Sequence, residues 1–397
     1  MMKNHLMNNY GRLPIQFERG NGAWLWDDEG NRYLDAIGGI AVCALGHAHP
    51  AVAEAVSEQM NTLVHTSNLY QIGHQTELAN KLSALSGMDN MFFSNSGAEA
   101  NEAAIKLARL YGHKRNIDEP CIIVTDNSFH GRTLATLSAT GNPKVQQGFE
   151  PLVSGFVRVP YNDIDAIKAA AEHNPNIVAV LVEPVQGEGG VNIPDADYLP
   201  QIRKLCDDKQ WLMMLDEIQT GIGRTGKWFG FQHYDITPDV MTLAKALGNG
   251  VPIGACLARG EAAELFAPGS HGSTYGGNPL ACRAALAVLQ TFEQNSLIEK
   301  STRDGLHILS ELNERLANKS YVKNIRGQGL IIGIELDRDC AAIVPIALKH
   351  GLLVNVTASS VIRLLPPVIM DDKQTSLLLD RLTMSIENFM QEQEANV

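Results

Sequence analysis

Lys245 and Asp216 are the residues of this sequence whose types and settings best fit covalent catalysis. Lys245 lies in the stretch Asp239–Gly254, after an apolar segment and before a glycine-rich turn, and Asp216 ends the apolar part of Leu212–Gln219. Burial disfavours the charged form of a lysine, so its amine becomes a usable nucleophile and proton carrier. An aspartate at the end of a strand can hold a protonated ring nitrogen. Together they form the minimal apparatus of an enzyme that uses pyridoxal phosphate.

Each of these two residues also has an ordinary structural interpretation. A lysine after an apolar run often extends its stem along the surface, and an aspartate at a strand end often caps a helix. The prediction therefore depends on the other parts of such a site being present in the right order.

The stretch Ser94–Asn101 is a candidate phosphate site. It forms a small-residue turn between a short expected strand, 91–93, and an expected helix. The start of a helix presents free N–H groups and the positive end of the helix dipole, and both favour a phosphate. An ordinary cap, with Ser96 accepting and Glu99 closing a capping box, is the alternative, and both can hold at once.

Phe129, Arg132 and Arg363 are candidate ligand contacts. Phe129 and Arg132 follow an expected strand at 121–125, and Arg363 lies between apolar residues in the run VIRLLPP. Phe129 could stack on a planar ring, although a phenylalanine is more often part of a core. Arg132 could grip a carboxylate in a bidentate manner. An arginine in the setting of Arg363 needs an anionic partner, which is either a substrate carboxylate or a structural ion pair.

Two glycine-rich loops add further candidates. The strand expected at 177–182 delivers a loop with the acids Glu183 and Glu188, and the loop 269–279 contains Ser273 and Thr274, which could donate to a phosphate. The strands alternate with helices, and each strand has its polar residues at its carboxyl end. This pattern predicts an α/β fold with a mostly parallel sheet and a site along its carboxyl edge.

The segment Gly221–Lys227 matches both G-x-G-x-x-G and the first seven positions of a P-loop. The P-loop interpretation fails at Trp228, where a serine or threonine is required. The dinucleotide interpretation fails because aromatic and glycine residues at 228–234 stand where a helix should begin. We interpret the segment as a structured turn beside the site.

Size and charge restrict the class of protein. A chain of 397 residues with 45% hydrophobic content can bury a large core and form two domains. A net charge of -12 argues against nucleic acid or an anionic membrane as the main partner. The N-terminus lacks the apolar core of a signal peptide, so we expect a cytoplasmic location. The six cysteines have no zinc spacing, and we expect no metal site.

The ordered set of motifs resembles the class III (subgroup II) pyridoxal-phosphate-dependent aminotransferases over nearly the whole chain, and within that family the branch that acts on acetylornithine. The motifs are GGIAVCALGHAHP, FFSNSGAEANEAAIKLAR, FHGRTLATLSATG, VEPVQGEGG, LDEIQTGIGRTGKWF, TLAKALGNGVPIGA, HGSTYGGNPLAC and RLLPP. The resemblance implies a fold type I transferase, in which residues 51–290 form a large domain. A smaller α+β domain would combine the segments 1–50 and 291–397.

Carried over residue by residue, the resemblance implies a cofactor site. Lys245 would form the Schiff base with pyridoxal phosphate, and Asp216 would pair with the ring nitrogen. The further implied cofactor contacts are Ser96, Gly97 and Ala98 at the phosphate, Phe129 and Ile218 on the two sides of the ring, Gln219 near the phenolic oxygen, and Thr274 at the phosphate of the other subunit. A homodimer with shared active sites is therefore implied.

The resemblance also implies the substrates. Arg132 and Ser273 would contact the acetylornithine end of the substrate, Arg363 would bind the α-carboxylate of glutamate or 2-oxoglutarate, and Glu183 would neutralise Arg363 when the ω-amine substrate is present. The implied reaction is a ping-pong transfer of the δ-amino group of N2-acetyl-L-ornithine to 2-oxoglutarate, as in arginine biosynthesis.

The residues leave the substrate open. Relatives that use succinylornithine, N-succinyldiaminopimelate precursors, ornithine or 4-aminobutyrate keep the same cofactor residues. An aminomutase or a decarboxylating transaminase could be built on the same scaffold, and a protein that binds pyridoxal phosphate without catalysis would also carry several of these motifs.

Overall fold

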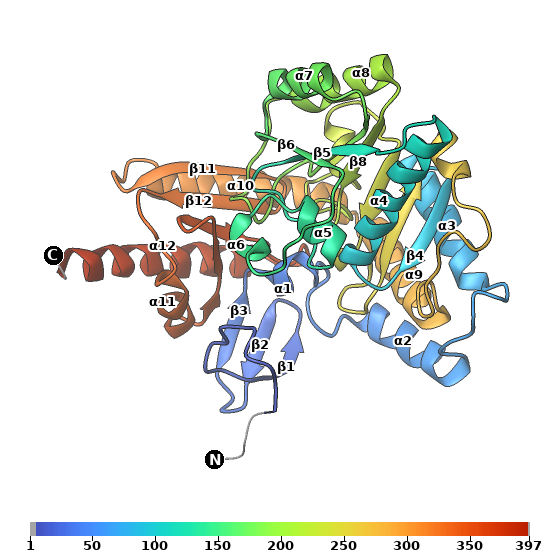
Figure 1. The fold of residues 1–397 in the computed structure, drawn as a ribbon. Coiled ribbons are helices and arrows are strands. Elements are labelled where there is room, and N and C mark those ends of the chain that lie inside the picture. The colour runs from blue at the N-terminus through green and yellow to red at the C-terminus, as the bar shows by residue number, and fades with distance from the viewer. Residues whose placement is uncertain (1–4, 396–397) are drawn as a thin grey trace.

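A seven-stranded sheet is the centre of the larger part of the molecule in a computed structural model that describes residues 5–395 (Figure 1). Only β10 runs antiparallel to its neighbours, while the other adjacent pairs are parallel. The prediction of a mostly parallel sheet is therefore confirmed. In spatial order the strands are β4 (Asn90–Ser94), β10 (Gly254–Ala258), β9 (Val240–Leu243), β8 (Leu212–Asp216), β7 (Ile177–Val182), β5 (Cys121–Thr125) and β6 (Phe156–Val159).

Helices cover both faces of this sheet, so its strands are buried on both sides. Along β8, Leu212 and Met214 pack in the cluster that includes α4 (Gly97–Lys114), whereas Met213 and Leu215 belong to the main core with α8 (Tyr198–Lys209). The further helices of this part are α2 (Pro50–Thr62), α3 (Gly73–Ser86), α5 (Leu134–Ala139), α6 (Pro143–Gln146), α7 (Ile164–His173) and α9 (Pro279–Gln294), with the 3-10 turns η1 (Gly230–His233), η2 (Lys245–Leu247) and η3 (Gly260–Glu264).

Two four-stranded sheets are built from the ends of the chain. The N-terminal sheet orders β1 (Phe17–Asn21), β2 (Trp24–Asp27), β3 (Arg32–Asp35) and β13 (Leu352–Leu353), and the C-terminal sheet orders β11 (Val322–Gln328), β12 (Ile331–Leu336), β15 (Val361–Leu364) and β14 (Asn355–Thr357). Because β13 pairs with β3, the two ends of the chain share one sheet. The domain boundaries at residues 50 and 290 stay predictions.

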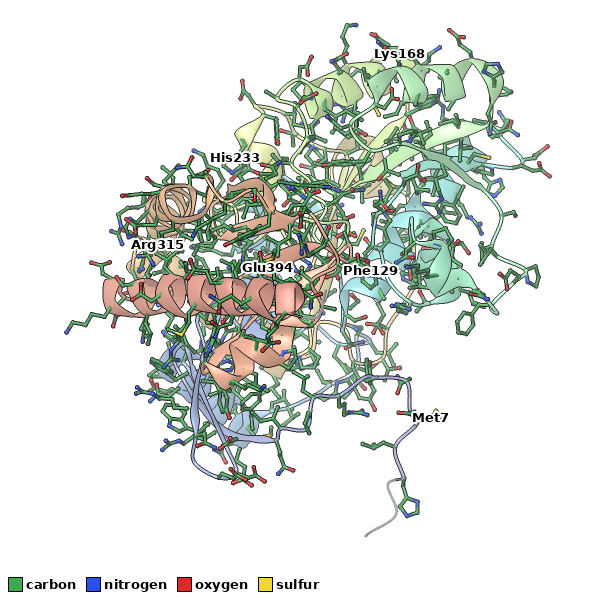
Figure 2. The ribbon with its side chains drawn as sticks, turned by 90° about the vertical axis from the view of Figure 1, so that its left-hand side faces the viewer. Met7, Phe129, Lys168, His233, Arg315 and Glu394 are labelled. Carbon is green, nitrogen blue, oxygen red and sulfur yellow. The ribbon has the colours of Figure 1, made fainter. Side chains whose placement is uncertain are left out.

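Three helices complete the C-terminal part: α10 (Leu297–Leu316), α11 (Ile343–Lys349) and α12 (Asp372–Ala395). Arg315 of α10 donates to Asp380 of α12 over 2.8 Å, and Figure 2 shows this arginine beside the long terminal helix. None of the helices within residues 5–395 combines the length and apolar character that a membrane crossing requires.

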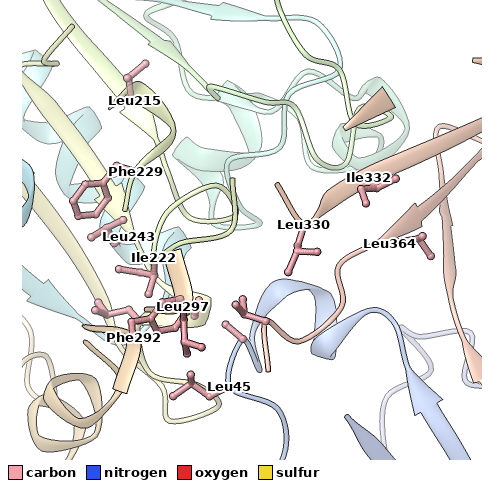
Figure 3. Packing of buried hydrophobic residues seen from close by; sticks show 14 of the residues in the cluster. Leu45, Leu215, Ile222, Phe229, Leu243, Phe292, Leu297, Leu330, Ile332 and Leu364 are labelled. Carbon is pink, nitrogen blue, oxygen red and sulfur yellow. The ribbon is translucent and has the colours of Figure 1, made fainter. Parts of the chain in front are cut away.

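One continuous core joins these parts (Figure 3). It extends from Leu215 and Leu243 of the large sheet, past Phe292 of α9, to Leu330 and Ile332 of the C-terminal part. The C-terminal strands are therefore packed against the same core as the strand that ends in Asp216.

The segment 221–227 is a turn, as predicted, and it lies where the large-sheet part of the molecule packs against the C-terminal part. A Cβ on Gly226 would lie 2.5 Å from Oγ1 of Thr302 in α10, and the fully buried Arg224 donates to the carbonyls of Leu330 and Pro366. This segment requires glycine because α10 and the turn after β11 approach its backbone too closely for a side chain. The segment packs the two parts of the fold together and does not line the site.

The segment 36–47 connects the N-terminal sheet to the remainder of the molecule through α1 (Gly38–Ala41), at the centre of Figure 1. Residues 38–41 all have positive φ angles, which is strained for Ile40 at φ 64°. The Asp35 carboxylate stabilises this turn by accepting from the N–H groups of Ile37 and Gly38, and its other oxygen lies 2.7 Å from Nε2 of His47.

The ion pair between His47 and Asp35 predicts a pH-dependent stability. Burial opposes the charged imidazole, but the hydrogen bonds to Asp35 and Cys43 outweigh it and raise the pKa of His47 from 6.5 to about 9. The stabilisation is therefore complete below pH 6.5 and is lost as the pH rises through 9. We expect His47→Gln to remove about 2 kcal/mol of the free energy of unfolding at neutral pH. Urea denaturation of the wild-type protein and the variant at several pH values measures the difference between their free energies of unfolding. A difference that does not shrink between pH 6.5 and 9 would contradict the role of this ion pair.

Candidate active site

A cavity of about 390 Å³ lies at the carboxyl edge of the large sheet. Parallel strands bring the residues that follow them to the same edge, which is the usual ligand position in such sheets. Of the predicted residues, the cavity is lined by Ser96, Gly97, Ala98, Phe129, Arg132, Glu183, Asp216, Ile218, Gln219 and Lys245.

Lys245 stands at the start of η2, directly after β9. Its φ of 45° is in the left-handed region, which side chains rarely adopt, and such strain is commonly found at functional sites. Burial lowers the pKa of Lys245, although the negative charge of Glu188 opposes this effect. The neutral amine is thus more accessible than in an exposed lysine.

Asp216, the last residue of β8, is fixed by three hydrogen bonds. Its Oδ1 accepts from the N–H of Ile218 over 3.1 Å, and its Oδ2 accepts from Nδ2 of Asn101 over 2.7 Å. Nδ1 of His130 lies 2.8 Å from the same Oδ2. These contacts fix the orientation of the Asp216 side chain and provide its buried oxygens with hydrogen-bond partners.

Sequence reasoning missed Asn101 and His130. Asn101 has no exposed surface and also accepts from Oγ1 of Thr242, so α4, β8 and β9 meet at one amide. A polar residue on the alanine-rich buried face of a predicted helix was the available signal, because a buried amide needs partners.

The start of α4 has the expected cap with one difference. The hydroxyl of Ser96 accepts from the N–H of Glu99, but Glu99 accepts from the N–H of Asn95 and not from that of Ser96. As first residues of a helix, Gly97 and Ala98 have N–H groups without an intrahelical acceptor.

Gly97 allows a close approach between this helix and the loop after β8. A Cβ built on Gly97 would lie 2.7 Å from Cδ1 of Ile218. The glycine therefore permits Ile218 to form one wall of the cavity beside the helix start.

Phe129 and Arg132 line the cavity from the loop after β5. The guanidinium carbon of Arg132 lies 5.7 Å from the centre of the Phe129 ring. Arg132 is exposed, and no carboxylate within residues 5–395 forms an ion pair with it. Its guanidinium is thus available to an anionic ligand.

Arg363 has a different partner from the one expected. Its Nη1 lies 2.6 Å from Oε1 of Glu188, whereas Glu183 accepts from the N–H of Phe129 over 3.1 Å. Glu188, and not Glu183, is thus the ion-pair partner of Arg363 in this structure, and the role expected of Glu183 when the ω-amine substrate is present stays a prediction. Both acids belong to one glycine-rich loop, and the direction of each side chain is decided by the turn of that loop, which sequence spacing does not give.

The pKa values of Glu183 and Glu188 are shifted in opposite directions. Burial, followed by the nearby Asp216, raises the pKa of Glu183 well above its usual value. Burial also acts on Glu188, but the Arg363 guanidinium outweighs it and lowers the pKa of this carboxyl. Glu183 thus favours the protonated form and can donate, while Glu188 is the counter-ion of Arg363, which does not itself line the cavity.

Ser273 and Thr274 lie outside the cavity of their own chain. Oγ of Ser273 accepts from the N–H of Gly276 over 2.9 Å, and Asn68 donates to the carbonyls of Ser273 and Gly276. Thr274 is exposed at the tip of this anchored loop. Its expected role toward a second subunit stays a prediction.

The residues of the cavity fit pyridoxal phosphate. The helix start at Gly97 suits a phosphate, and a cavity bounded by Phe129 and Ile218 suits a flat ring. The fixed carboxylate of Asp216 suits a protonated ring nitrogen, and Lys245 suits an aldehyde carbon. This fold and this combination of groups define a pyridoxal-phosphate-dependent transferase of fold type I.

Comparison with known proteins gives the family. The sequence model described as "Aminotransferase class-III" matches residues 6–386. Acetylornithine aminotransferase from Nitrosomonas europaea is 57% identical over 387 residues, which cover 98% of each chain. An ornithine aminotransferase structure from Toxoplasma gondii, described with partial occupancy of PLP at its active site, has a TM-score of 0.94 at 33% identity and covers 98% of this chain and 94% of that one. Acetylornithine aminotransferase from Elizabethkingia anophelis has a TM-score of 0.86 at 34% identity, with 97% and 96% covered.

The chain belongs to the class III aminotransferases. It is a pyridoxal-phosphate-dependent aminotransferase, and the fold type I prediction is confirmed.

The contact between Gly97 and Ile218 predicts a specific effect on cofactor binding. In Gly97→Ala the new methyl group must displace Ile218, so we expect the affinity for pyridoxal phosphate to fall by about tenfold or more, because a well-packed site resists added volume. Gly73→Ala is the matched control, since Gly73 is also the first residue of a helix and has open space around its Cβ position. Fluorescence titration of the cofactor-free proteins measures both, and equal affinities would contradict the role of Gly97.

Proposed function

We propose that this enzyme transfers the δ-amino group of N2-acetyl-L-ornithine to 2-oxoglutarate, giving N-acetyl-L-glutamate 5-semialdehyde and L-glutamate. The acetylornithine aminotransferases of Nitrosomonas europaea and Bordetella bronchiseptica, 57% and 52% identical over nearly the whole chain, support this assignment.

The structural observation that carries the proposal is the contrast between two arginines. Arg132 lines the cavity without an ion pair, whereas Arg363 is neutralised by Glu188. An ω-amino acid has its carboxylate far from the reacting amine. Its site therefore needs one unpaired arginine far from the reacting carbon, to bind that carboxylate, and no unpaired arginine beside the reacting carbon, where the substrate has no negative charge. 2-Oxoglutarate has two carboxylates and can engage both arginines once Glu188 moves aside.

Lys245 is the residue that we assign to bond formation and proton transfer. Bound pyridoxal phosphate supplies an electrophilic carbonyl carbon and a ring that accepts the electron pair left when a C–H bond beside the amine nitrogen breaks. The lowered pKa of Lys245 favours a neutral Nζ with a free lone pair, through which this residue would hold the cofactor. With the substrate amine bound in the cavity, Nζ would take the proton from the δ-carbon.

Asp216 and its partners supply a fixed negative charge. Asn101 and His130 hold the Oδ2 atom, so the carboxylate needs no reorganisation when positive charge at the ring nitrogen must be maintained. Phe129 and Ile218 would enclose the ring and exclude water, and Gln219 would lie near the phenolic oxygen. Ser96, Gly97 and Ala98 would hold the phosphate.

The substrate contacts follow from the same geometry. Arg132, with Ser273 of the second chain's loop, would hold the carboxylate end of acetylornithine, and Arg363 would bind the α-carboxylate of 2-oxoglutarate. We assign to Glu188 the neutralising role that sequence reasoning gave to Glu183. Glu183, whose pKa burial raises, would in its protonated form donate to a ligand oxygen in the cavity.

A homodimer with shared sites is part of the proposal. The loop of Thr274 lies against the segment 63–70, where the ring of His65 is 5.4 Å from that of Tyr275. Leu69 and Tyr70 are 86% and 69% exposed in this segment. Exposed large apolar side chains that are close together in sequence favour an interaction surface. A second copy seated there would receive Thr274 at its phosphate site.

The test is an absorbance measurement of the purified enzyme without any keto acid. N-acetylornithine, N-succinylornithine, ornithine and 4-aminobutyrate are added separately, and we expect the visible absorbance of the cofactor to decay fastest with N-acetylornithine. Lys245→Ala serves as the control and should show no such decay, because the proton carrier is absent. A faster decay with another amine would refute the substrate assignment.

Arg363→Ala should separate the two substrates. A charge-assisted hydrogen bond contributes about 1.5–3 kcal/mol, so we expect KM for 2-oxoglutarate to rise by about tenfold to a hundredfold. KM for acetylornithine should change much less, because its reacting end has no carboxylate. Steady-state kinetics with each substrate varied in turn gives both values, and equal rises would remove the proposed role of Arg363.

A further inference from the structure

Two segments that are about 200 residues apart in sequence form neighbouring parts of the cavity wall. Val42 lines the cavity from the segment 36–47, and Gly250 and Val251 line it from the turn that follows Lys245. The segment 36–47 is fixed on its other sides, since Ala36 and Ala44 accept from the N–H groups of Leu365 and Val368.

Asn249 joins the two segments. Its Oδ1 accepts from the N–H of Leu45 over 2.8 Å, and its Nδ2 donates to the carbonyl of Gly46 over 3.0 Å. Among residues 5–395, these are the hydrogen bonds that connect the segment 36–47 with the turn 245–251. One amide therefore satisfies a backbone donor and the following backbone acceptor at once.

The residue type and the backbone of Asn249 both fit this role. Its φ of 46° lies in the left-handed region, which asparagine adopts more readily than most residues with a side chain. An aspartate could accept from Leu45 but could not donate to Gly46. A glycine would suit the backbone but would leave both partners without the amide.

The turn itself transmits the position of Asn249 to Lys245. The N–H of Gly248 donates to the carbonyl of Lys245 over 3.1 Å, and the N–H of Asn249 donates to that of Ala246. A Cβ on Gly248 would lie 2.0 Å from the carbonyl oxygen of Val251, so the turn is closely packed. A shift of Asn249 relative to Lys245 would therefore have to break this packing.

We propose that Asn249 is a positioning residue that fixes the wall carrying Val42 relative to the turn carrying Lys245, and so sets the width of the cavity for the amine substrate. The amide of Asn249 acts by holding the backbone of Leu45 and Gly46, because Asn249 does not itself line the cavity. This inference deepens the proposed function and rests on it only for the identity of the amine substrate.

Asn249→Gly is the decisive variant, because glycine keeps the left-handed backbone and removes only the amide. In the cofactor-loaded enzyme we expect the amide of Leu45 to exchange with deuterium about tenfold faster, since exchange requires local opening. We expect KM for N-acetylornithine to rise by about fivefold, as for the loss of one or two hydrogen bonds, with kcat nearly unchanged. Asn249→Asp should keep Leu45 protected and still raise KM.

Asn116→Gly is the matched control, because Asn116 lies far from the cavity lining and has a φ of 60°. It should change neither the exchange of residues 36–47 nor KM. Unchanged exchange at Leu45 in Asn249→Gly would overturn the proposal, as would equal KM values in the two glycine variants or faster exchange spread evenly over the chain. The exchange measurement needs no substrate, so it tests the proposal even if another amine proves to be the donor.

Discussion

The site depends on one buried negative charge, the carboxylate of Asp216. Leaving such a charge inside a protein costs several kcal/mol unless it is paired or hydrogen-bonded. Asn101 and His130 provide those bonds, and Thr242 fixes Asn101 in turn. These residues come from α4, from β9 and from the loop that follows β5, so three separate elements contribute to the hydrogen bonds around one carboxylate.

A second group of charges is balanced differently. Lys245, Glu188 and Arg363 influence one another, as the causes of the perturbed pKa values of Lys245 and Glu188 indicate. Arg363 is fully buried, and its Nη2 has no hydrogen-bond partner among the described residues. A ligand carboxylate could supply the missing partner only if Glu188 withdrew. The oxygens of Asp216 are thus held by several partners, whereas Arg363 has one unpaired nitrogen, and this difference fits an enzyme that keeps one cofactor and alternates between two substrates.

Much of the fold could be predicted from the sequence, because local patterns reflect local physics. The buried runs that end at Asp216 and Lys245 are strands β8 and β9, and Gly87 ends α3 in the left-handed conformation. Contacts between distant segments were less accessible. Neither His130 at Asp216 nor the choice of Glu188 over Glu183 follows from spacing, since each depends on how a loop turns after its strand. The role proposed for Thr274 would depend on a second chain, about which one sequence contains no geometric information.

The antiparallel strand β10 has a consequence for the ligand that the cavity can hold. It lies between β4, which leads to the start of α4, and β9, which leads to Lys245. Adjacent strands are about 4.8 Å apart, so the carboxyl ends of β4 and β9 are separated across the sheet by two such spacings, or about 10 Å. The backbone hydrogen bonds of the sheet fix this lateral spacing. A ligand that reaches from the start of α4 to the turn of Lys245 must therefore cross the width of β10.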